Sequence, residues 1–218
     1  MVHHGGMSDE VARVLAAAAQ GVFPPADGTV TVVAQPNERD AGVLAFTAHS
    51  VVFTDEDPDW VRAELAATSS DALAAAMNPV FLARMTARCG RHMNTIDLLT
   101  VADALPGPPP VALREIDDPE HPRVARAVKF RDGVRVWAAD GGMVVLGRGV
   151  AGRWEAAVEV DEDARGRGLG RDLAVAARHL VPGPAVWAQQ SPGNARSVRT
   201  FQAAGYRPVG SEALFIAG

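Results

Sequence analysis

The chain has 218 residues, of which 48% are hydrophobic and 22% are charged, and its formal net charge is −5. This length and composition are sufficient for a hydrophobic core in one or two domains. No uncharged apolar run reaches the roughly 18 residues of a membrane span. The acidic balance also argues against a nucleic-acid-binding protein.

The cysteine content and the first residues bear on the compartment. The single cysteine, Cys89, excludes an internal disulfide and favours a reducing cytoplasm. A basic segment followed by an apolar one is missing at the start, so we expect no signal peptide. Residues 1–7 are predicted to be a tail, with a second start at Met7. We therefore expect a cytoplasmic protein.

The first half of the chain is predicted to form an α/β lobe. Hydrophobic periodicity and helix-start residues predict helices at 9–20, 57–68 and 71–91, the last interrupted at Asn78-Pro79, and strands at 29–34, 43–54 and 94–102. The segment 43–54 is expected to be one long strand that bends near His49.

A proline-rich run, Leu105-Pro-Gly-Pro-Pro-Pro110, marks the clearest boundary, because it cannot continue a helix or a central strand. We predict a lobe at 1–105, a linker at 106–110 and a second domain at 111–218. The second domain is predicted to contain strands at 111–116, 134–139, 142–148, 153–160, 185–190 and 209–216. Its predicted helices are 119–129, 168–180 and a last one that begins at Asn194 and is completed by 199–204.

The most distinctive motif lies between the predicted strand 153–160 and the helix that follows it. It reads Arg165-x-x-Gly168-x-Gly170, with a further glycine at Gly166. Glycines permit a tight turn and leave main-chain N–H groups open to a ligand, and the following helix directs its own N–H groups and positive dipole end to the same place. Such an arrangement is typical of a phosphate-binding site.

The charge distribution supports a polyanionic ligand of small size. From Arg165 to Arg207 the chain has seven arginines and one acid, a net charge of +6 within a chain of −5. A local basic segment in an acidic protein favours a compact anion over a long nucleic acid, which needs a broader basic face. The alternative is an arginine-rich helix face exposed to solvent.

These motifs resemble those of the Gcn5-related N-acetyltransferase (GNAT) family, which holds acetyl-coenzyme A between two splayed parallel strands. The Arg165 motif is similar to the family's pyrophosphate-binding turn, and Asn194 with a helix ending at Gly205-Tyr206 is similar to its second motif. The resemblance covers 154–208 and extends plausibly back to Val111. It implies a GNAT-like mixed sheet with flanking helices, an α/β (α+β) fold. Only one helix fits after the first strand, where the family has two.

The resemblance also implies the residues that bind the coenzyme. Peptide groups of the strand would pair with the pantetheine amides, the turn would bind the pyrophosphate, and the second motif would complete the site. The implied residues are Val158, Val160, Arg165, Gly166, Arg167, Gly168, Leu169, Gly170, Arg171, Asn194, Ser197 and Phe201.

The catalytic residues are less determined. An amine with a pKa near 10.4 needs a base, and Glu155 and Glu159 are the two candidates on the strand. A bulge there would change which side chain faces the acceptor, so both remain open. The family's base positions are occupied by Ala156 and Trp154, and its general-acid tyrosine is replaced by Phe201.

Together these features predict an acetyl-coenzyme A-dependent N-acetyltransferase whose acceptor is an amine of a small molecule or a peptide. The alternative is a non-catalytic acyl-coenzyme A-binding regulatory protein, which the phenylalanine at position 201 favours. The six histidines show no metal-ligand spacing, so we expect no metal. We expect no nucleic-acid or membrane partner, and a homodimer is compatible with the sequence.

Overall fold

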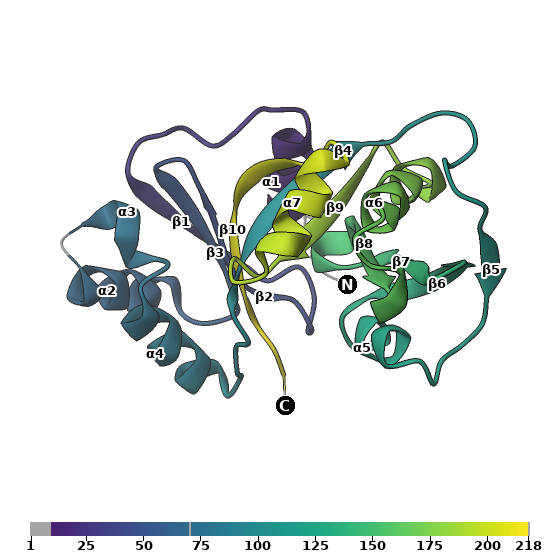
Figure 1. The fold of residues 1–218 in the computed structure, drawn as a ribbon. Helices are drawn as coiled ribbons and strands as arrows, with labels where there is room; N and C mark the ends of the chain where they lie inside the picture. Colours follow the sequence, from purple (N-terminus) through teal and green to yellow (C-terminus); the bar gives the residue numbers. More distant parts are fainter. Residues whose placement is uncertain (1–9, 70, 218) are drawn as a thin grey trace, which may run out of the picture. The chain divides into compact units, whose positions relative to one another are not determined.

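The structure is a computed structural model that describes residues 10–69 and 71–217. The predicted tail, 1–7, lies outside these residues. The described chain divides into two compact units: unit 1 comprises the segment up to Leu98 together with the segment from Val209, and unit 2 is Leu99–Pro208. Each unit contains a mixed α/β arrangement of strands and helices (Figure 1), so the predicted fold class is confirmed.

Unit 1 has the strand order β1-β3-β2-β10. Its elements are α1 (Glu10–Ala19), β1 (Thr29–Val33), β2 (Ala41–Phe46), β3 (His49–Phe53), α2 (Pro58–Thr68), α3 (Ala72–Ala75), α4 (Pro79–Cys89) and most of β10 (Arg207–Phe215). The β1–β3 pair is parallel, and the β2–β3 and β2–β10 pairs are antiparallel. Apolar residues of α2 and α4 pack on one face of this sheet.

One prediction in unit 1 is wrong. The segment 43–54 is not one bent strand: β2 and β3 form a hairpin in which Phe46 lies opposite His49. The two-residue turn is Thr47-Ala48, and Ala48 has a φ of 53°. Glycine or asparagine usually occupies the left-handed position of such a turn and marks it in the sequence. Here an alanine occupies that position, so the sequence contains no turn signal. The continuous apolar pattern therefore concealed the reversal.

Unit 2 has the strand order β4-β9-β8-β7-β6-β5. Its elements are β4 (Ile96–Asp103, which begins in unit 1), β5 (Arg114–Ile116), α5 (Pro122–Phe130), β6 (Asp132–Ala139), β7 (Gly142–Arg148), the 3-10 turns Val150–Gly152 and Glu162–Ala164, β8 (Trp154–Val160), α6 (Leu169–Leu180), β9 (Ala185–Gln190) and α7 (Ala195–Ala203). As predicted, α5 is the single helix between β5 and β6 in the described chain.

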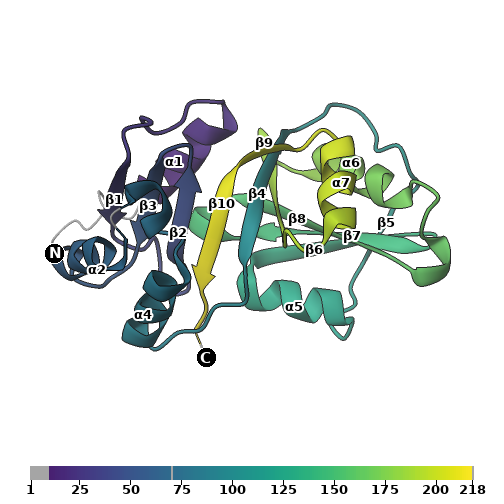
Figure 2. The ribbon, with the colours of Figure 1, turned by 60° about the vertical axis from the view of Figure 1, so that its left-hand side comes forward.

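The helices of unit 2 cover opposite faces of its sheet. Figure 2 shows α6 and α7 on one side and α5 on the other. The α6 side contains the larger apolar cluster, to which Leu173, Ala156 and Phe201 belong. The α5 side contains a smaller cluster around Val124 and Val145. Because side chains alternate along a strand, the two faces of β8 meet different helices.

The compact units are divided differently from the predicted domains. The first passage between units is at Leu98–Leu99, within β4 and before the proline run, and the last strand returns to unit 1. In that unit β10 pairs with β2, with Ala213 opposite Val43. Pairing between strands distant in sequence leaves no signal in local composition. A run of prolines is visible there, which is why the boundary was predicted at that run.

Candidate functional site

The strand β8 is fully paired on one edge and only briefly on the other. Its antiparallel register with β7 runs without interruption from Trp154 to Val160, so there is no bulge on that edge. Its parallel pairing with β9 contains one register pair, Glu155 opposite Trp187. The C-terminal half of β8 therefore presents an edge on which no described register pair with β9 occurs.

The direction of the hydrogen bonds alternates along β8 and shows which peptide groups face this edge. Asp161, directly after β8, donates its backbone N–H to the Gly141 carbonyl on the β7 side. Along a strand the N–H and C=O groups of one residue point to the same side and alternate from residue to residue. The even-numbered residues, including Val158 and Val160, therefore turn their peptide groups towards the β9 edge. These are the two strand residues predicted to hold pantetheine.

The glycine turn leads from β8 into α6. Gly166 and Gly168 have φ angles of 82° and 89°, a left-handed conformation that favours glycine. Gly168 is the N-cap of α6, and no side chain caps this helix. The turn residues Arg165–Gly168 are exposed. Arg171 and Asp172 donate their backbone N–H groups to the Gly168 carbonyl, so the N–H groups open to a ligand at the end of β8 are those of Leu169 and Gly170.

This uncapped start distinguishes α6 from the other helices whose N-caps the structure describes. In the other α-helices with a described N-cap, the N-cap side chain accepts a backbone N–H of the first turn. These residues are Asp57 in α2, Asp71 in α3, Asn78 in α4, His121 in α5 and Asn194 in α7. Helix N–H groups without a cap need another acceptor, and an anion is a suitable one.

The arginines of the basic segment separate into two groups. Arg165 is exposed at the turn and donates from Nε to the Val160 carbonyl at 3.3 Å. Arg167 and Arg171 are exposed beside it, and Arg171 also lies 3.2 Å from the Asp172 carboxylate. Arg178, in contrast, donates to the carbonyls of residues 103 and 204 and fastens α6 to neighbouring segments. The charge available at the turn is therefore smaller than the sequence total.

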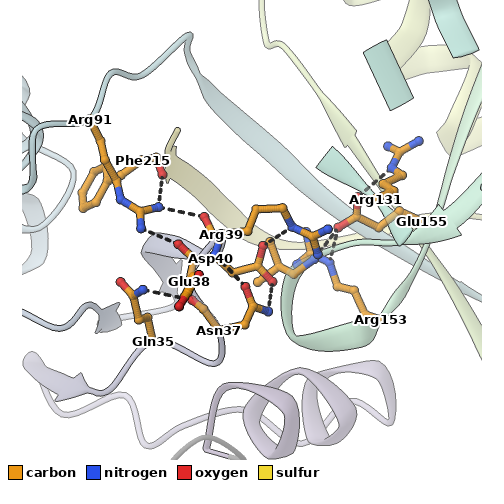
Figure 3. Close-up of polar contacts among 11 residues, drawn as sticks. Gln35, Asn37, Glu38, Arg39, Asp40, Arg91, Arg131, Arg153, Glu155 and Phe215 are labelled. Carbon is orange, nitrogen blue, oxygen red and sulfur yellow. Dashed lines mark hydrogen bonds and ion pairs between the residues drawn. The ribbon is translucent and has the colours of Figure 1, made fainter. Parts of the chain in front are cut away.

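Glu155 lies in a buried ion-pair cluster (Figure 3). Its carboxylate accepts from Arg131 Nε at 2.9 Å and from Arg153 Nε at 2.8 Å, and the Val150 N–H lies 3.3 Å away. Only 3% of Glu155 is exposed. Burial raises its pKa, but the two guanidinium groups outweigh burial and leave the pKa below its usual range.

The surroundings of Glu155 are fitted closely to its carboxylate. A Cβ at Gly149 would lie 2.1 Å from the carboxylate carbon, so only glycine fits there. Arg153 also lies over the Trp187 ring, 5.3 Å from its centroid, on the neighbouring strand. The cluster thus joins the turn before β8 to the point where β8 and β9 pair. This arrangement fits a residue that stabilises the fold.

Glu159 is more accessible. It lies on the same face of β8 as Glu155, the α5 face, where Arg123 Nε donates to its carboxylate at 2.8 Å. The Arg123 and Glu159 side chains are 36% and 37% exposed. Met143 lies opposite Glu159 on β7. Of the two candidate bases, Glu159 has the carboxylate that solvent and a substrate can reach. Arg123 lies 36 residues earlier in the chain, and no sequence motif indicated that it would contact Glu159.

The second motif supplies helix-capping and packing groups. Asn194 is the N-cap of α7, and its side chain accepts the Ser197 N–H at 3.1 Å. Phe201 is buried, 4.9 Å from the Tyr206 ring in an edge-to-face contact. The Tyr206 hydroxyl donates to the Ala174 carbonyl at 3.2 Å, and burial raises its pKa well above the usual range. Neither ring presents an acid to solvent.

The described residues offer neither a metal-ligand cluster nor a membrane-spanning helix. Over residues 10–69 and 71–217, no group of three or more histidine, cysteine, aspartate or glutamate side chains could hold a metal ion. Within the same residues, no helix combines the length and the apolar character that a bilayer crossing requires.

Unit 2 is therefore a mixed α/β unit in which a glycine turn leads from β8 into α6 on one face of the sheet, while α5 covers the other face. Similar solved structures include a Gcn5-related N-acetyltransferase from Sphaerobacter thermophilus, with 15% identity and a TM-score of 0.38, covering 62% of this chain and 55% of that one. This chain therefore matches about half the length of that protein.

Two further solved structures have similarly low sequence identities and TM-scores. A GNAT-family acetyltransferase from Novosphingobium aromaticivorans has 19% identity and a TM-score of 0.38, covering 59% of this chain and 67% of that one. A Gcn5-related N-acetyltransferase from Kribbella flavida has 16% identity and a TM-score of 0.42, covering 99% and 97%. No protein-family model and no curated protein matches the chain.

Proposed function

We propose that unit 2 is an acetyl-coenzyme A-dependent N-acetyltransferase that acetylates an amine of a small molecule or a peptide. The observation that carries this proposal is the uncapped N-terminus of α6, which follows the left-handed Gly168 at the end of β8. An anion bound there would complete the hydrogen bonding of the helix start. The neighbouring peptide groups of Val158 and Val160 suit an amide-bearing chain attached to that anion.

The residues of the turn fit a pyrophosphate linked to pantetheine. Backbone N–H groups from Arg165 to Gly170 would bind the phosphate oxygens, and Arg165 and Arg171 would add charge-assisted bonds. The Arg165 side chain donates to the Val160 carbonyl. To bind the coenzyme, this carbonyl would exchange its contact with Arg165 for one with the pantetheine. When bound, the coenzyme supplies the acetyl thioester; the protein's part is to hold it and to prepare the amine.

We assign the deprotonation of the amine to Glu159. The ammonium proton passes to this carboxylate, directly or through a water, before the nitrogen attacks the thioester carbonyl. Glu155 is unsuited to this step because its carboxylate is buried and engaged by two arginines. In this proposal the developing oxyanion accepts from the N–H of Val158, one of the peptide groups on the β9 edge.

A second candidate function is a non-catalytic acyl-coenzyme A-binding regulator. It is favoured by the absence of an accessible acid at the second motif, where Phe201 is buried and the Tyr206 hydroxyl is bound to a carbonyl. This absence slows catalysis rather than preventing it, because a thiol with a pKa near 8.5 leaves partly as the thiolate at neutral pH. We therefore retain the transferase as the first proposal.

Two measurements test the proposal. Calorimetry should detect coenzyme A binding, and Gly168→Ala should weaken it. Release of free thiol from acetyl-coenzyme A over an amine panel should show turnover, and Glu159→Gln should lower kcat while coenzyme affinity stays unchanged. Binding without thiol release on any amine would favour the regulator. No binding by the parent protein would exclude both functions.

We further propose that the protein acts in the cytoplasm, without a nucleic-acid or membrane partner, and that any assembly is a homodimer. The acidic composition and single cysteine support the first two statements. Light scattering of the purified protein would test the assembly.

A further inference from the structure

The ion pair between Arg123 and Glu159 bears on the choice of acceptor. Arg123 belongs to the first turn of α5, whose apolar face packs on β6 and β7, and this packing places its guanidinium over the α5 face of β8. Glu159 extends from that face and accepts from Arg123 Nε at 2.8 Å. The proposed base is therefore covered by a cation in the absence of substrate.

The Arg123 guanidinium occupies the Glu159 carboxylate, so an ammonium group can reach that carboxylate only when the pair opens. Glu159 must leave Arg123 before it can accept a proton from the substrate. Both side chains are more than one-third exposed, so they can rotate apart, and surface ion pairs of this kind are weak. Opening the pair, however, leaves a guanidinium beside the incoming ammonium group.

This juxtaposition disfavours an acceptor that carries only positive charge, because its ammonium would face Arg123 at close range. An acceptor with a carboxylate next to its amine avoids the repulsion. Its carboxylate takes the place of Glu159 on the Arg123 fork, where planar two-oxygen recognition is favourable. Its ammonium then meets the released Glu159.

We propose that the acceptor is an α-amino acid or another amine bearing an adjacent carboxylate, and that Arg123 is the residue that selects it. This inference rests on the proposed function of unit 2. The ammonium gives its proton to Glu159, and the nitrogen forms a bond to the acetyl carbon. The C–S bond breaks and the thiolate leaves with the electron pair. The nitrogen loses its second proton to the thiolate or to solvent, and Glu159 passes its own proton to solvent. The ionised Glu159 then recovers Arg123 and displaces the anionic N-acetyl product.

The test compares acceptors that differ only in the carboxylate. Thiol release is measured with glycine, leucine and phenylalanine, each as the free acid, as the methyl ester and as the decarboxylated amine. The methyl esters have less basic amines and react more readily without a catalyst, so a preference for the free acid runs against intrinsic reactivity. The parent protein should prefer free acids over both analogues by at least about tenfold in kcat/KM, a difference of about 1.4 kcal/mol.

Arg123→Gln should bring that ratio close to one, and Arg123→Lys should restore part of it. The matched control is Arg126→Gln on the same helix, since Arg126 lies over the Phe130 ring and not on Glu159. It should keep the parental ratio. A ratio of rates does not depend on the fraction of folded enzyme, so a purely structural effect of Arg123→Gln would leave it unchanged.

The outcomes separate the two proposals. Thiol release with equal rates on acids, esters and amines overturns the inference and leaves the transferase standing. A preference for free acids that persists in Arg123→Gln overturns the assignment to Arg123. No thiol release with the nine compounds, but release with another member of the amine panel, overturns the inference alone. No thiol release with any compound, while calorimetry shows coenzyme binding, overturns both the transferase and the inference.

Discussion

The two glutamates of β8 allow a direct test of how burial separates a structural carboxylate from a reactive one. Glu155 and Glu159 lie on the same face of one strand, each bound by arginine, and differ mainly in exposure. Removing one partner of a buried ion pair leaves a charge without compensation and costs about 3–5 kcal/mol. An exposed pair contributes about 0.2–1 kcal/mol. We therefore expect Glu155→Gln to destabilise unit 2 several times more than Glu159→Gln.

The assay is urea unfolding followed by tryptophan fluorescence. Replacing Trp60 by phenylalanine leaves Trp137, Trp154 and Trp187 as the tryptophans, all in unit 2. With an m-value of roughly 2 kcal/mol per molar urea, a loss of about 4 kcal/mol lowers the midpoint by about 2 M. Glu159→Gln should lower it by less than about 0.5 M.

The pH dependence supplies a second readout with a defined sign. The folded pKa of Glu155 is lowered, so its contribution to stability is fully present above the unfolded pKa of about 4.3 and is lost as the pH falls through the folded value. The gap between the parent and Glu155→Gln should therefore narrow below about pH 4. Equal midpoints for the two Gln variants at pH 7 would refute the reasoning.

The remaining predictions concern the turn and the second motif. Gly168→Ala should weaken coenzyme A binding at least about tenfold in calorimetry, because Gly168 has a φ of 89°. Gly168→Asn should recover the stability of the fold, since asparagine tolerates this conformation. If Gly168→Asn also recovers the affinity for coenzyme A, backbone strain alone explains the weaker binding of Gly168→Ala. Gly170→Ala should cost about 1 kcal/mol in urea unfolding, because its Cβ would lie 3.3 Å from Thr200 Cγ2, and an unchanged midpoint would contradict this packing. Tyr206→Phe should cost about 1 kcal/mol for the lost bond to Ala174 and leave the alkaline limb of the pH–rate profile in place; loss of that limb would show that the hydroxyl takes part in catalysis.

Local patterns were sufficient for the elements that carry the candidate site. The alternation of 153–160 and the three glycines after it predicted β8, the turn and α6, and the structure has β8 at Trp154–Val160 and α6 at Leu169–Leu180. A capping asparagine likewise predicted the start of α7 at Asn194. In each case neighbouring residues determine the conformation, so a short window contains the information.

Features that depend on distant pairing could not be predicted in the same way. The β2–β3 reversal at Ala48 lacked a turn residue, and the return of β10 to unit 1 has no local signal. The roles of the glutamates also stayed open, because alternation places Glu155 and Glu159 on one face without showing their partners. Arg131 and Arg123, the residues that distinguish them, lie 24 and 36 positions earlier in the chain.

The separation of the two carboxylates has a consequence for the chemistry of β8. In the proposed function, one strand must remain rigid enough to hold a coenzyme along its edge and must also offer a carboxylate that a substrate can reach. Glu155, near the start of the strand and bound by two arginines, anchors the end that pairs with β9. Glu159, four residues further on, lies where that pairing no longer continues, and a single accessible arginine covers it. The fold thus places its buried acid where the strands join, and its accessible acid, the base in the proposed function, towards the part of β8 without a register pair to β9.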